Sequence, residues 1–218
     1  MTTSSSLEFL YGGTFDPVHY GHLAIIDGLR TLAPDTPIRI IPCAVPALKG
    51  KPSTLFEQRV EMLELATENF KQIIIDQREV DREGASYTLD TLVTLKKDYP
   101  DKQFVLVMGA DTVASIQQWY QWQKLSQICH LLIFNRPGIS NEAVEQATKD
   151  ADFRLVESFN ALTTMKAGNA YFQIMKEKIH SSTQIKQSVR NKLTLDSMLP
   201  ESVIEYICQN HLYMSEKS

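Results

Sequence analysis

The sequence predicts an α/β fold built on a doubly wound parallel sheet of five strands. Short runs rich in β-branched and aromatic residues alternate with amphipathic stretches of helical period along most of the 218 residues. The helical stretches have the length of roughly 10–15 residues that is typical of right-handed crossovers between parallel strands. Such crossovers place helices on both faces of the sheet.

Composition excludes several classes of protein. Hydrophobic residues make up 43% of the chain and charged residues 22%, as in ordinary globular proteins. The longest apolar run, residues 104–110, is far shorter than the roughly 20 residues of a membrane helix. Three widely spaced cysteines suit reduced thiols in a cytoplasm, with no metal cluster. A net charge of −4 argues against a nucleic-acid partner. We therefore predict a cytoplasmic protein with small-molecule partners; the oligomeric state stays open.

The first two thirds of the chain carry the predicted strands and crossover helices. The strands are residues 7–12, 38–42, 73–76, 104–108 and 131–134. Strand 104–108 is apolar throughout, which indicates burial on both faces. A first helix is predicted over 21–32, a second after a capping box of Thr54 and Glu57, and a third capped by Ser86 and ending before Pro100. A Trp-rich stretch that follows strand 104–108 is also predicted to be helical.

After residue 138 the alternation weakens. Residues 139–152 are predicted to be helical, and residues 153–179 irregular with short strand candidates. Helices are expected over 182–191 and 200–210. The chain thus predicts one domain over 7–213 with a helical C-terminal subregion from about residue 180, a disordered start over 1–6 and a tail over 214–218.

The loop after the first strand contains the most informative pattern. Gly12 and Gly13 allow a sharp turn that exposes backbone N–H groups, and the segment then opens a helix whose N-terminus favours phosphate. His19 and His22 are three residues apart, so they share one face of the first helical turn. Gly21 between them leaves space for a ring or a ribose. These features predict a phosphate site with two imidazole donors.

Other interpretations of this loop fit the sequence less well. No Gly-Lys-Ser/Thr follows, as a P-loop requires, and the three spaced glycines of the dinucleotide fingerprint are absent. A zinc site is disfavoured because Asp16 is the one nearby acidic or thiol ligand, and a proline follows it. Ordinary surface histidines on a capped helix would explain either histidine alone, but not both together with Gly-Gly-Thr at the end of a strand.

Residues 12–22 resemble the His-x-Gly-His signature of the nucleotidyltransferase superfamily, which implies a Rossmann-like fold. The longer form, Gly-Gly-Thr14-Phe15-Asp16-Pro17, resembles the bacterial nicotinate-mononucleotide adenylyltransferases. His-x-Gly-His also marks class I tRNA synthetases and other adenylyl- and cytidylyltransferases, so the rest of the chain has to agree.

Further motifs of that family recur along the chain. They are Ser86-Tyr87-Thr88 at a substrate-loop helix, Gly109-Ala110-Asp111 after strand 104–108, Trp119-Tyr120-x-Trp122, Arg136-Pro137-Gly138, and Ser181-Ser182-Thr183-Gln184-Ile185-Lys186. The resemblance covers residues 8–213. Three departures stand out: Leu48 replaces a usual histidine before Lys49, Lys186 stands where an arginine is usual, and His180 stands where an apolar residue is common.

Several of these residues also have purely structural interpretations. Asp111 is interpreted as a ligand of a ribose hydroxyl, or as a helix N-cap, and the two are compatible. Trp119 and Trp122 are spaced as core residues, but the surrounding glutamines favour stacking of Trp119 on a pyridine ring with Trp122 beneath. Ser182 and Thr183 are equally well read as an N-cap pair. Lys49 and Lys51 are also compatible with plain solvated charges.

The resemblance implies adenylyl transfer from ATP to nicotinate mononucleotide, giving nicotinate adenine dinucleotide and pyrophosphate. His19 and His22 are the expected catalytic residues. The resemblance implies an ATP site formed by Gly12, Gly13, Thr14, Phe15, His19, Gly21, His22, Gly109, Asp111, Ser182, Thr183 and Lys186. It implies a mononucleotide site formed by Asp16, Lys49, Thr88, Trp119 and Tyr120. Mg²⁺ is expected to be held mainly by the ATP phosphates, with no protein metal site.

Rival functions predict other features. A class I tRNA synthetase needs a longer chain with a Lys-Met-Ser-Lys-Ser-like loop. A phosphopantetheine or glycerol-phosphate nucleotidyltransferase shares the first loop but does not require Trp119-Tyr120-x-Trp122. A non-catalytic nucleotide sensor would be expected to lose one of the two histidines, and both are present.

Overall fold

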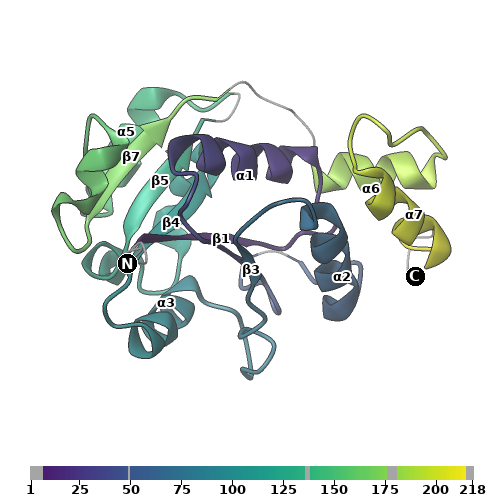
Figure 1. Cartoon of the computed structure of the whole chain (residues 1–218), viewed down its shortest axis with the longest axis horizontal. Coiled ribbons are helices and arrows are strands. Elements are labelled where there is room, and N and C mark those ends of the chain that lie inside the picture. Colours follow the sequence, from purple (N-terminus) through teal and green to yellow (C-terminus); the bar gives the residue numbers. More distant parts are fainter. Residues whose placement is uncertain (1–6, 49, 136–137, 176–180, 215–218) are drawn as a thin grey trace.

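The computed structural model describes residues 7–48, 50–135, 138–175 and 181–214, and these form one parallel sheet of seven strands in the order β3-β2-β1-β4-β5-β7-β6 (Figure 1). The strands are β1 (Leu7–Gly13), β2 (Ile38–Pro42), β3 (Ile73–Ile75), β4 (Gln103–Gly109), β5 (His130–Phe134), β6 (Arg154–Leu155) and β7 (Asn169–Gln173). The predicted class and all five predicted strands are confirmed. The expected number of five strands is wrong, because short strand candidates within residues 153–179 form β6 and β7 and join the sheet.

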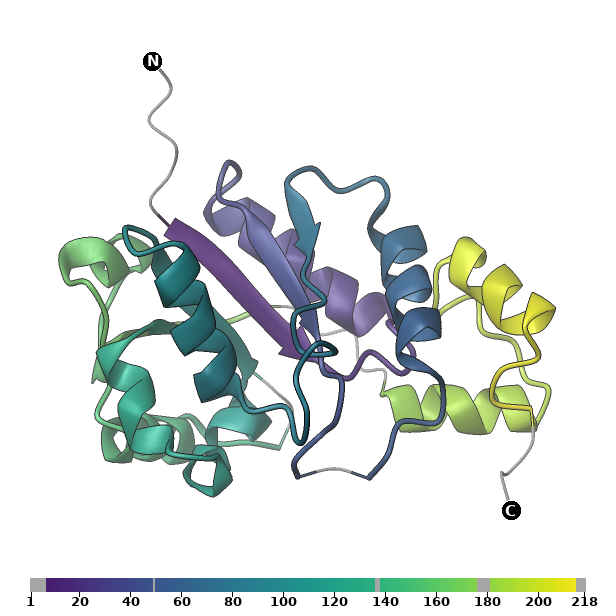
Figure 2. The same ribbon diagram turned by 90° about the horizontal axis from the view of Figure 1, so that it is seen from below.

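Helices cover both faces of the sheet, as the crossover rule requires (Figure 2). The α-helices are α1 (Tyr20–Leu32), α2 (Phe56–Thr67), α3 (Thr88–Asp98), α4 (Ala110–Val113), α5 (Asn141–Asp150), α6 (Ser182–Arg190) and α7 (Glu201–Gln209). Three short 3₁₀ helices are η1 (Ile116–Gln118), η2 (Trp122–Gln127) and η3 (Phe159–Thr164). The Trp-rich stretch expected to be helical therefore consists of η1 and η2, separated by Trp119, Tyr120 and Gln121.

The side chains of β1 alternate between two hydrophobic cores. Phe9 and Tyr11 face a core shared with α1, α2 and the C-terminal helices. Leu10 faces the opposite core, which is shared with α3, α4 and α5. Because both faces of β1 are covered, this strand lies at the centre of the molecule. The loop that follows β1, which carries the predicted phosphate site, therefore begins at the end of a strand that is covered on both faces.

Two predicted helix caps are wrong, for one physical reason. The α2 helix begins at Phe56, and Thr54 donates its hydroxyl to the Asp16 carboxylate at 2.8 Å. The α3 helix begins at Thr88, and the Ser86 hydroxyl accepts a hydrogen bond from the Val45 amide. Each side chain expected to cap its own helix instead ties that helix start to a loop from elsewhere in the chain.

The C-terminal helices α6 and α7 lie beside α2 at one end of the molecule (Figure 1). The segment that joins α6 to α7 contacts the start of α1, where the Tyr20 amide donates to the Met198 carbonyl at 2.9 Å. Within the described ranges, every helix is too short or too polar to cross a lipid bilayer. The predicted disordered start over 1–6 and residues 215–218 of the predicted tail lie outside the described residues.

His130 is a fully buried histidine at the start of β5. Its Nδ1 accepts a hydrogen bond from the Asn169 amide at 3.2 Å, which requires a ring that is unprotonated at this nitrogen. Burial lowers the pKa of His130 below its ordinary value of 6.5, and the positive charge of Lys96 adds to this effect. Hydrogen bonds to the backbone act in the opposite direction, but they are outweighed. Folding therefore requires a neutral ring here.

This neutral histidine predicts acid sensitivity. Because the pKa is lower in the folded chain, the unfolded chain binds the proton first, and stability is lost as pH falls from 6.5 towards the folded-state value. One such group contributes a slope of at most about 1.4 kcal/mol per pH unit. Denaturant unfolding between pH 7 and 5 should be less pH-dependent in His130→Gln than in wild type. Substitution of the exposed His211 by Gln is the control, and an equal slope in wild type and His130→Gln would contradict the assignment.

Candidate active site

The candidate site lies where the strand order reverses. From β1 the chain builds outward through β2 and β3, then returns to place β4 on the other side of β1. Tyr11 pairs with Val107, so the carboxyl ends of β1 and β4 reach the same edge of the sheet. Ligands of open α/β sheets bind at such a switch point. The first loop and the Gly109–Asp111 segment, both expected to hold ATP, are therefore neighbours.

The first loop has a strained, closely packed backbone. Phe15 adopts a φ of 49°, a left-handed conformation that is uncommon outside glycine. Its ring is 2% exposed and folds back over Gly13, where an added Cβ would lie 2.9 Å from the ring. The same ring meets the His22 imidazole edge-on, with centroids 4.9 Å apart. Gly13 therefore permits the ring position that supports His22, while Gly12 is exposed.

The two histidines stack on each other at the start of α1. Their ring centroids are 3.8 Å apart at an interplanar angle of 28°. The backbone amide of His19 donates to Nδ1 of His22 at 3.2 Å, so the proton of a neutral His22 ring sits on Nε2. His19 is buried and His22 is half-buried. The predicted pair on one helical face is confirmed as a geometric unit.

Arg59 is a site residue that sequence reasoning missed. It projects from α2 with 1% of its surface exposed, and its Nη1 donates to the Thr14 carbonyl at 2.7 Å and to the Cys43 carbonyl at 2.8 Å. Burial lowers the pKa of Arg59, the Asp16 carboxylate opposes that shift, and a guanidinium remains charged at neutral pH. Arg59 thus joins the loops that follow β1 and β2.

A continuous run of contacts links the first loop to the residues expected to hold the second substrate. Cys43 donates its amide to the Gly13 carbonyl at 2.8 Å, and Ser86 donates its amide to the Val45 carbonyl at 2.8 Å. Next to Ser86, the Tyr87 ring packs on the Tyr120 ring with centroids 4.5 Å apart. The loops after β1 and β2, the start of α3 and the segment between η1 and η2 are therefore connected.

Thr88, Trp119 and Tyr120 fall within this run. Thr88 is the first residue of α3 and is half-buried. Tyr120 is 45% exposed, whereas Trp119 is half-buried and packs, with Trp122, against the second core. The core and ligand-platform interpretations of Trp119 are thus compatible, since one part of the ring packs inward and another part remains accessible.

Asp111 lies at the end of β4 but does not cap a helix. Gly109 is the N-cap of the short helix α4, and Asp111 is exposed in its first turn. The N-cap interpretation is therefore wrong, and the position remains suitable for a carboxylate that faces a polar ligand at the switch point.

The start of α6 is capped by a residue other than those expected. Ser181 is the N-cap, its hydroxyl accepting from the Gln184 amide at 3.2 Å, so the N-cap interpretation of Ser182 and Thr183 is wrong. Ser182 instead donates to the Pro17 carbonyl at 3.1 Å, and Thr183 is exposed. These contacts bring α6 against the first loop.

Lys186 and Asp16 are paired with each other. Lys186, expected to bind ATP, donates to the Asp16 carboxylate at 2.7 Å. Asp16, expected to bind the mononucleotide, is 3% exposed. The structure therefore pairs a buried carboxylate with a half-buried lysine beside the first loop. Lys49, Arg136 and Pro137 lie outside the described residues.

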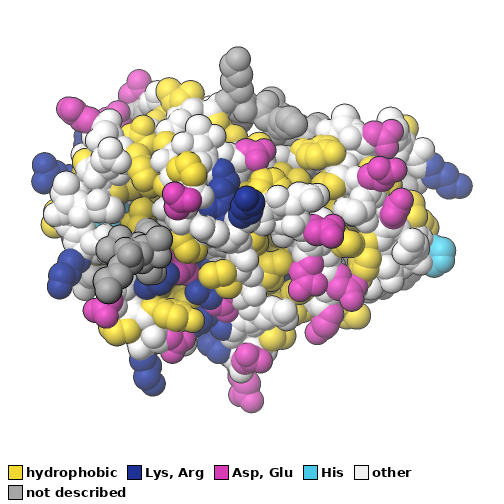
Figure 3. Space-filling view, viewed as in Figure 1, with side chains coloured by type: hydrophobic (Ala, Val, Ile, Leu, Met, Phe, Trp, Pro, Cys, Tyr) yellow, Lys and Arg dark blue, Asp and Glu magenta, His cyan; other side chains and the backbone are white. Residues whose placement is uncertain are grey.

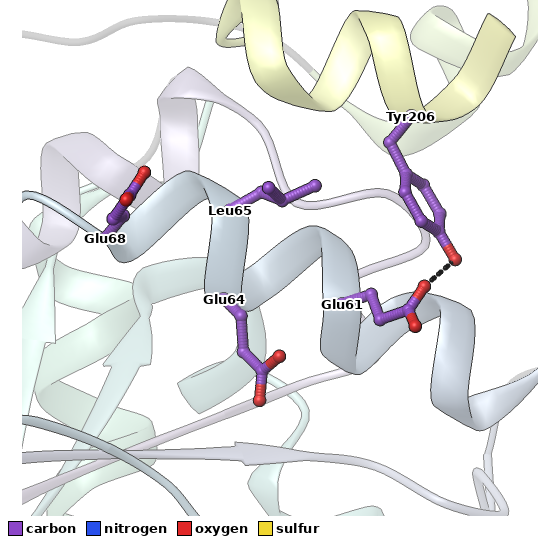
Figure 4. Close-up of a pocket in the computed structure, with 5 residues that line it drawn as sticks. All are labelled: Glu61, Glu64, Leu65, Glu68 and Tyr206. Atoms are coloured by element: carbon purple, nitrogen blue, oxygen red, sulfur yellow. Dashed lines mark hydrogen bonds between the residues drawn. The ribbon is translucent and has the colours of Figure 1, made fainter. Parts of the chain in front are cut away.

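A surface groove between α2 and α7 is unsuited to a nucleotide. It is lined by Glu61, Glu64, Leu65, Glu68 and Tyr206 (Figure 4). Acidic side chains also gather on this end of the molecule in the space-filling view (Figure 3). Three glutamates would repel phosphate groups. The groove therefore does not compete with the switch-point loops as the candidate site.

Comparison with known proteins shows the family of the chain. The cytidylyltransferase-like family model matches residues 10–188. A probable nicotinate-nucleotide adenylyltransferase of Marinomonas sp. (strain MWYL1) is 36% identical over 205 residues, covering 94% of this chain and 93% of the relative. One of Shigella boydii serotype 4 is 34% identical, covering 95% and 99%.

A solved structure has the same fold. The Plasmodium falciparum nicotinic acid mononucleotide adenylyltransferase complexed with NaAD superposes with a TM-score of 0.75 at 20% identity, covering 95% of this chain and 97% of that one.

The fold, the stacked histidines and the family match together define a nucleotidyltransferase of the cytidylyltransferase-like family. Within that class, the chain belongs to the nicotinate-nucleotide adenylyltransferase family, whose members it matches over nearly their whole length.

Removal of Arg59 is expected to destabilise the protein. Arg59→Met keeps an apolar stem of similar length but leaves the Thr14 and Cys43 carbonyls without this donor. Each hydrogen bond to a charged group contributes about 1.5–3 kcal/mol, so the free energy of unfolding should fall by about 3 kcal/mol or more. Denaturant unfolding measures it, with the exposed Arg154→Met as the matched control. Equal stability of the two variants would show that Arg59 does not hold the loops.

Proposed function

We propose that the chain transfers the adenylyl group of ATP to the phosphate of nicotinate mononucleotide, releasing pyrophosphate and forming nicotinate adenine dinucleotide. The observation that carries this proposal is the stacked His19–His22 pair at the start of α1, at the switch point of the sheet. Full-length similarity to nicotinate-nucleotide adenylyltransferases supports the choice of substrates.

In this reaction the mononucleotide supplies its own nucleophile. An ionised phosphate oxygen attacks the α-phosphorus of ATP, the bond from that phosphorus to the bridging oxygen breaks, and pyrophosphate leaves with the electron pair. No general base is needed, because the attacking oxygen is already deprotonated at neutral pH. Catalysis then depends on position and on stabilisation of charge at the phosphoryl oxygens.

The two histidines supply that stabilisation. Because the His19 amide donates a hydrogen bond to Nδ1 of His22, the proton of the neutral His22 ring is on Nε2. Nε2 is the nitrogen that would donate to a phosphate oxygen. Stacking at 3.8 Å fixes one imidazole relative to the other, so both act on one developing charge. Gly12, Gly13 and Thr14 would add backbone amides, and the N-terminus of α1 adds its dipole.

Other predicted residues would bind the rest of ATP. Gly21, inside the first turn of α1, would leave room for the adenosine, and Asp111 at the end of β4 would accept from a ribose hydroxyl. Thr183, exposed in the first turn of α6, would contact the polyphosphate together with Ser182.

The second substrate would bind beside the Tyr87–Tyr120 pair. Backbone amides near Thr88 and Tyr120 would meet the nicotinate carboxylate, and Trp119 would stack on the ring. Neutral amide donors favour the acid over the corresponding amide. Lys49 would meet the phosphate of the mononucleotide with a single ammonium charge.

Mg²⁺ would bind at this site through the phosphates of ATP. In the described parts of the chain, no group of three or more His, Cys, Asp or Glu residues is arranged to hold a metal ion. Bound with ATP, Mg²⁺ would neutralise phosphate charge and keep most of its water ligands. The chain's own donors would still orient the reacting groups.

A pyrophosphate-release assay with ATP and a panel of acceptors tests the proposal. Nicotinate mononucleotide should be the preferred acceptor over nicotinamide mononucleotide, phosphopantetheine and glycerol phosphate. His22→Ala should lower kcat by about 10²-fold or more with a modest change in the KM of ATP, as for loss of one oxyanion donor. His19→Ala should lower kcat by a similar factor, and the double variant should lose less than the product of the two single-variant factors. Preference for another acceptor would reject the proposed substrate, and wild-type kcat in His22→Ala would remove His22 from the mechanism.

Trp119→Ala should affect the second substrate selectively. Stacking on an aromatic side chain is worth about 1–3 kcal/mol, so the KM of the mononucleotide should rise by about 10-fold or more while that of ATP stays nearly constant. Trp122→Ala is the matched control, because Trp122 packs against the same core. An equal rise in both KM values, or equal behaviour of the two variants, would make Trp119 a core residue only.

A further inference from the structure

Asp16 is a buried carboxylate whose oxygens are fully engaged by the protein. With 3% of its surface exposed, it accepts from four donors at 2.7–2.8 Å. The donors are the Ser53 amide and Lys186 Nζ on Oδ2, and the hydroxyls of Thr54 and Tyr213 on Oδ1. An ionised carboxylate offers about four lone-pair sites, so little capacity is left for a substrate.

These contacts hold the carboxylate in its ionised form. Burial acts to raise the pKa of Asp16, but the hydrogen bonds from Lys186, Ser53, Thr54 and Tyr213 outweigh it and lower the pKa below its ordinary value. Lys186 also donates to the Ser53 hydroxyl at 3.0 Å, and its ammonium lies 5.7 Å from the centre of the Tyr213 ring. The lysine charge is therefore directed at Asp16.

The donors arrive from three separate segments. Ser53 and Thr54 precede α2, Lys186 belongs to α6, and Tyr213 follows α7. The C-terminal subregion holds the first loop at two further points, where Ser182 donates to the Pro17 carbonyl and the Tyr20 amide donates to Met198. The chain on either side of His19 is thus held by residues distant in sequence.

We propose that Asp16 is a positioning residue for adenylyl transfer, anchored by Tyr213, Lys186 and Thr54 so that the loop presents His19 and His22 in reacting geometry. The inference rests on the proposed function for its chemistry. In this arrangement Asp16 does not bind the mononucleotide, and Lys186 serves as the counter-ion of Asp16. The C-terminal subregion becomes a clamp on the catalytic loop.

The histidine geometry is sensitive to this anchor. Phe15, one residue before Asp16, contacts the His22 ring, and His19, three residues after it, stacks on that ring. Rotation of the Asp16 turn would therefore move both supports of the imidazole pair. A misplacement of about 1 Å can cost about 10²-fold in rate, so loss of one anchoring bond should lower kcat measurably.

A pair of tyrosine variants tests the proposal. Tyr213→Phe removes only the hydroxyl that donates to Asp16. Tyr206→Phe removes an equivalent hydroxyl that donates to Glu61 in the groove between α2 and α7 (Figure 4). We expect kcat to fall about 10-fold in Tyr213→Phe, with both KM values within about twofold of wild type. Tyr206→Phe should keep the wild-type kcat.

Two outcomes would overturn the proposal. An unchanged kcat in Tyr213→Phe would show that the anchor does not position the loop. A raised KM for the mononucleotide with retained kcat would make Asp16 part of the substrate site. If Tyr213→Phe does not fold, Thr54→Val decides in its place, since it removes another donor to the same Oδ1 atom without changing the side-chain shape.

A second readout does not depend on turnover. In substrate-free protein, the imidazole NMR signals of His19 and His22 should shift in Tyr213→Phe and stay in place in Tyr206→Phe. Unmoved signals in Tyr213→Phe would contradict positioning. If wild type fails to use nicotinate mononucleotide while the histidine signals still respond, the proposed function fails and the positioning role of Asp16 stands.

Discussion

The position of β1 is the constraint on which the rest of the structure depends. It pairs with β2 on one side and β4 on the other, and the strand order reverses around it. Right-handed crossovers then send α1 and α3 to opposite faces of the sheet, and the loops that follow β1 and β4 meet at the edge between them. A loop at that edge has room for a ligand, and the N-terminus of α1, whose dipole favours an anion, begins directly after that loop. The chemistry of the histidines follows from this placement.

Opposite charges buried beside that loop keep it in one conformation. Arg59 binds two loop carbonyls, and Asp16 accepts from donors in three segments. A buried charge without partners is costly, so each of these groups holds its partners firmly in place. The loop backbone itself is strained at Phe15, which adopts a φ of 49°. Strain of this kind persists only where the surroundings fix the conformation, and the two charged groups provide that surrounding.

The sequence correctly predicted those elements that depend on residues close together in the chain. Residues 104–108 of β4 are apolar throughout, and the spacing of His19 and His22 brings the two rings together at the start of α1, as the structure confirms. Strand β6 has only two residues, and β7 begins and ends with Asn169 and Gln173, so neither has a clear strand pattern. In the sequence, Arg59 is a charged residue within an amphipathic helix, where exposure to solvent is the usual expectation. Its burial depends on where two loops converge, which no nearby residue indicates.

The same limit explains the interpretation of Lys186. Read locally, a lysine one turn into a helix that begins with two hydroxyls indicates an anion site. Its actual partner, Asp16, lies 170 residues away, and Tyr213 reaches the same carboxylate across 197 residues. The family that this chain resembles usually has an arginine at this position, and the planar guanidinium group of arginine can bind phosphate through two parallel hydrogen bonds. The single ammonium of Lys186 instead donates at once to Asp16 and to the Ser53 hydroxyl. The lysine thus forms a partly buried ion pair with Asp16, and this pair ties α6 to the loop that carries the histidines.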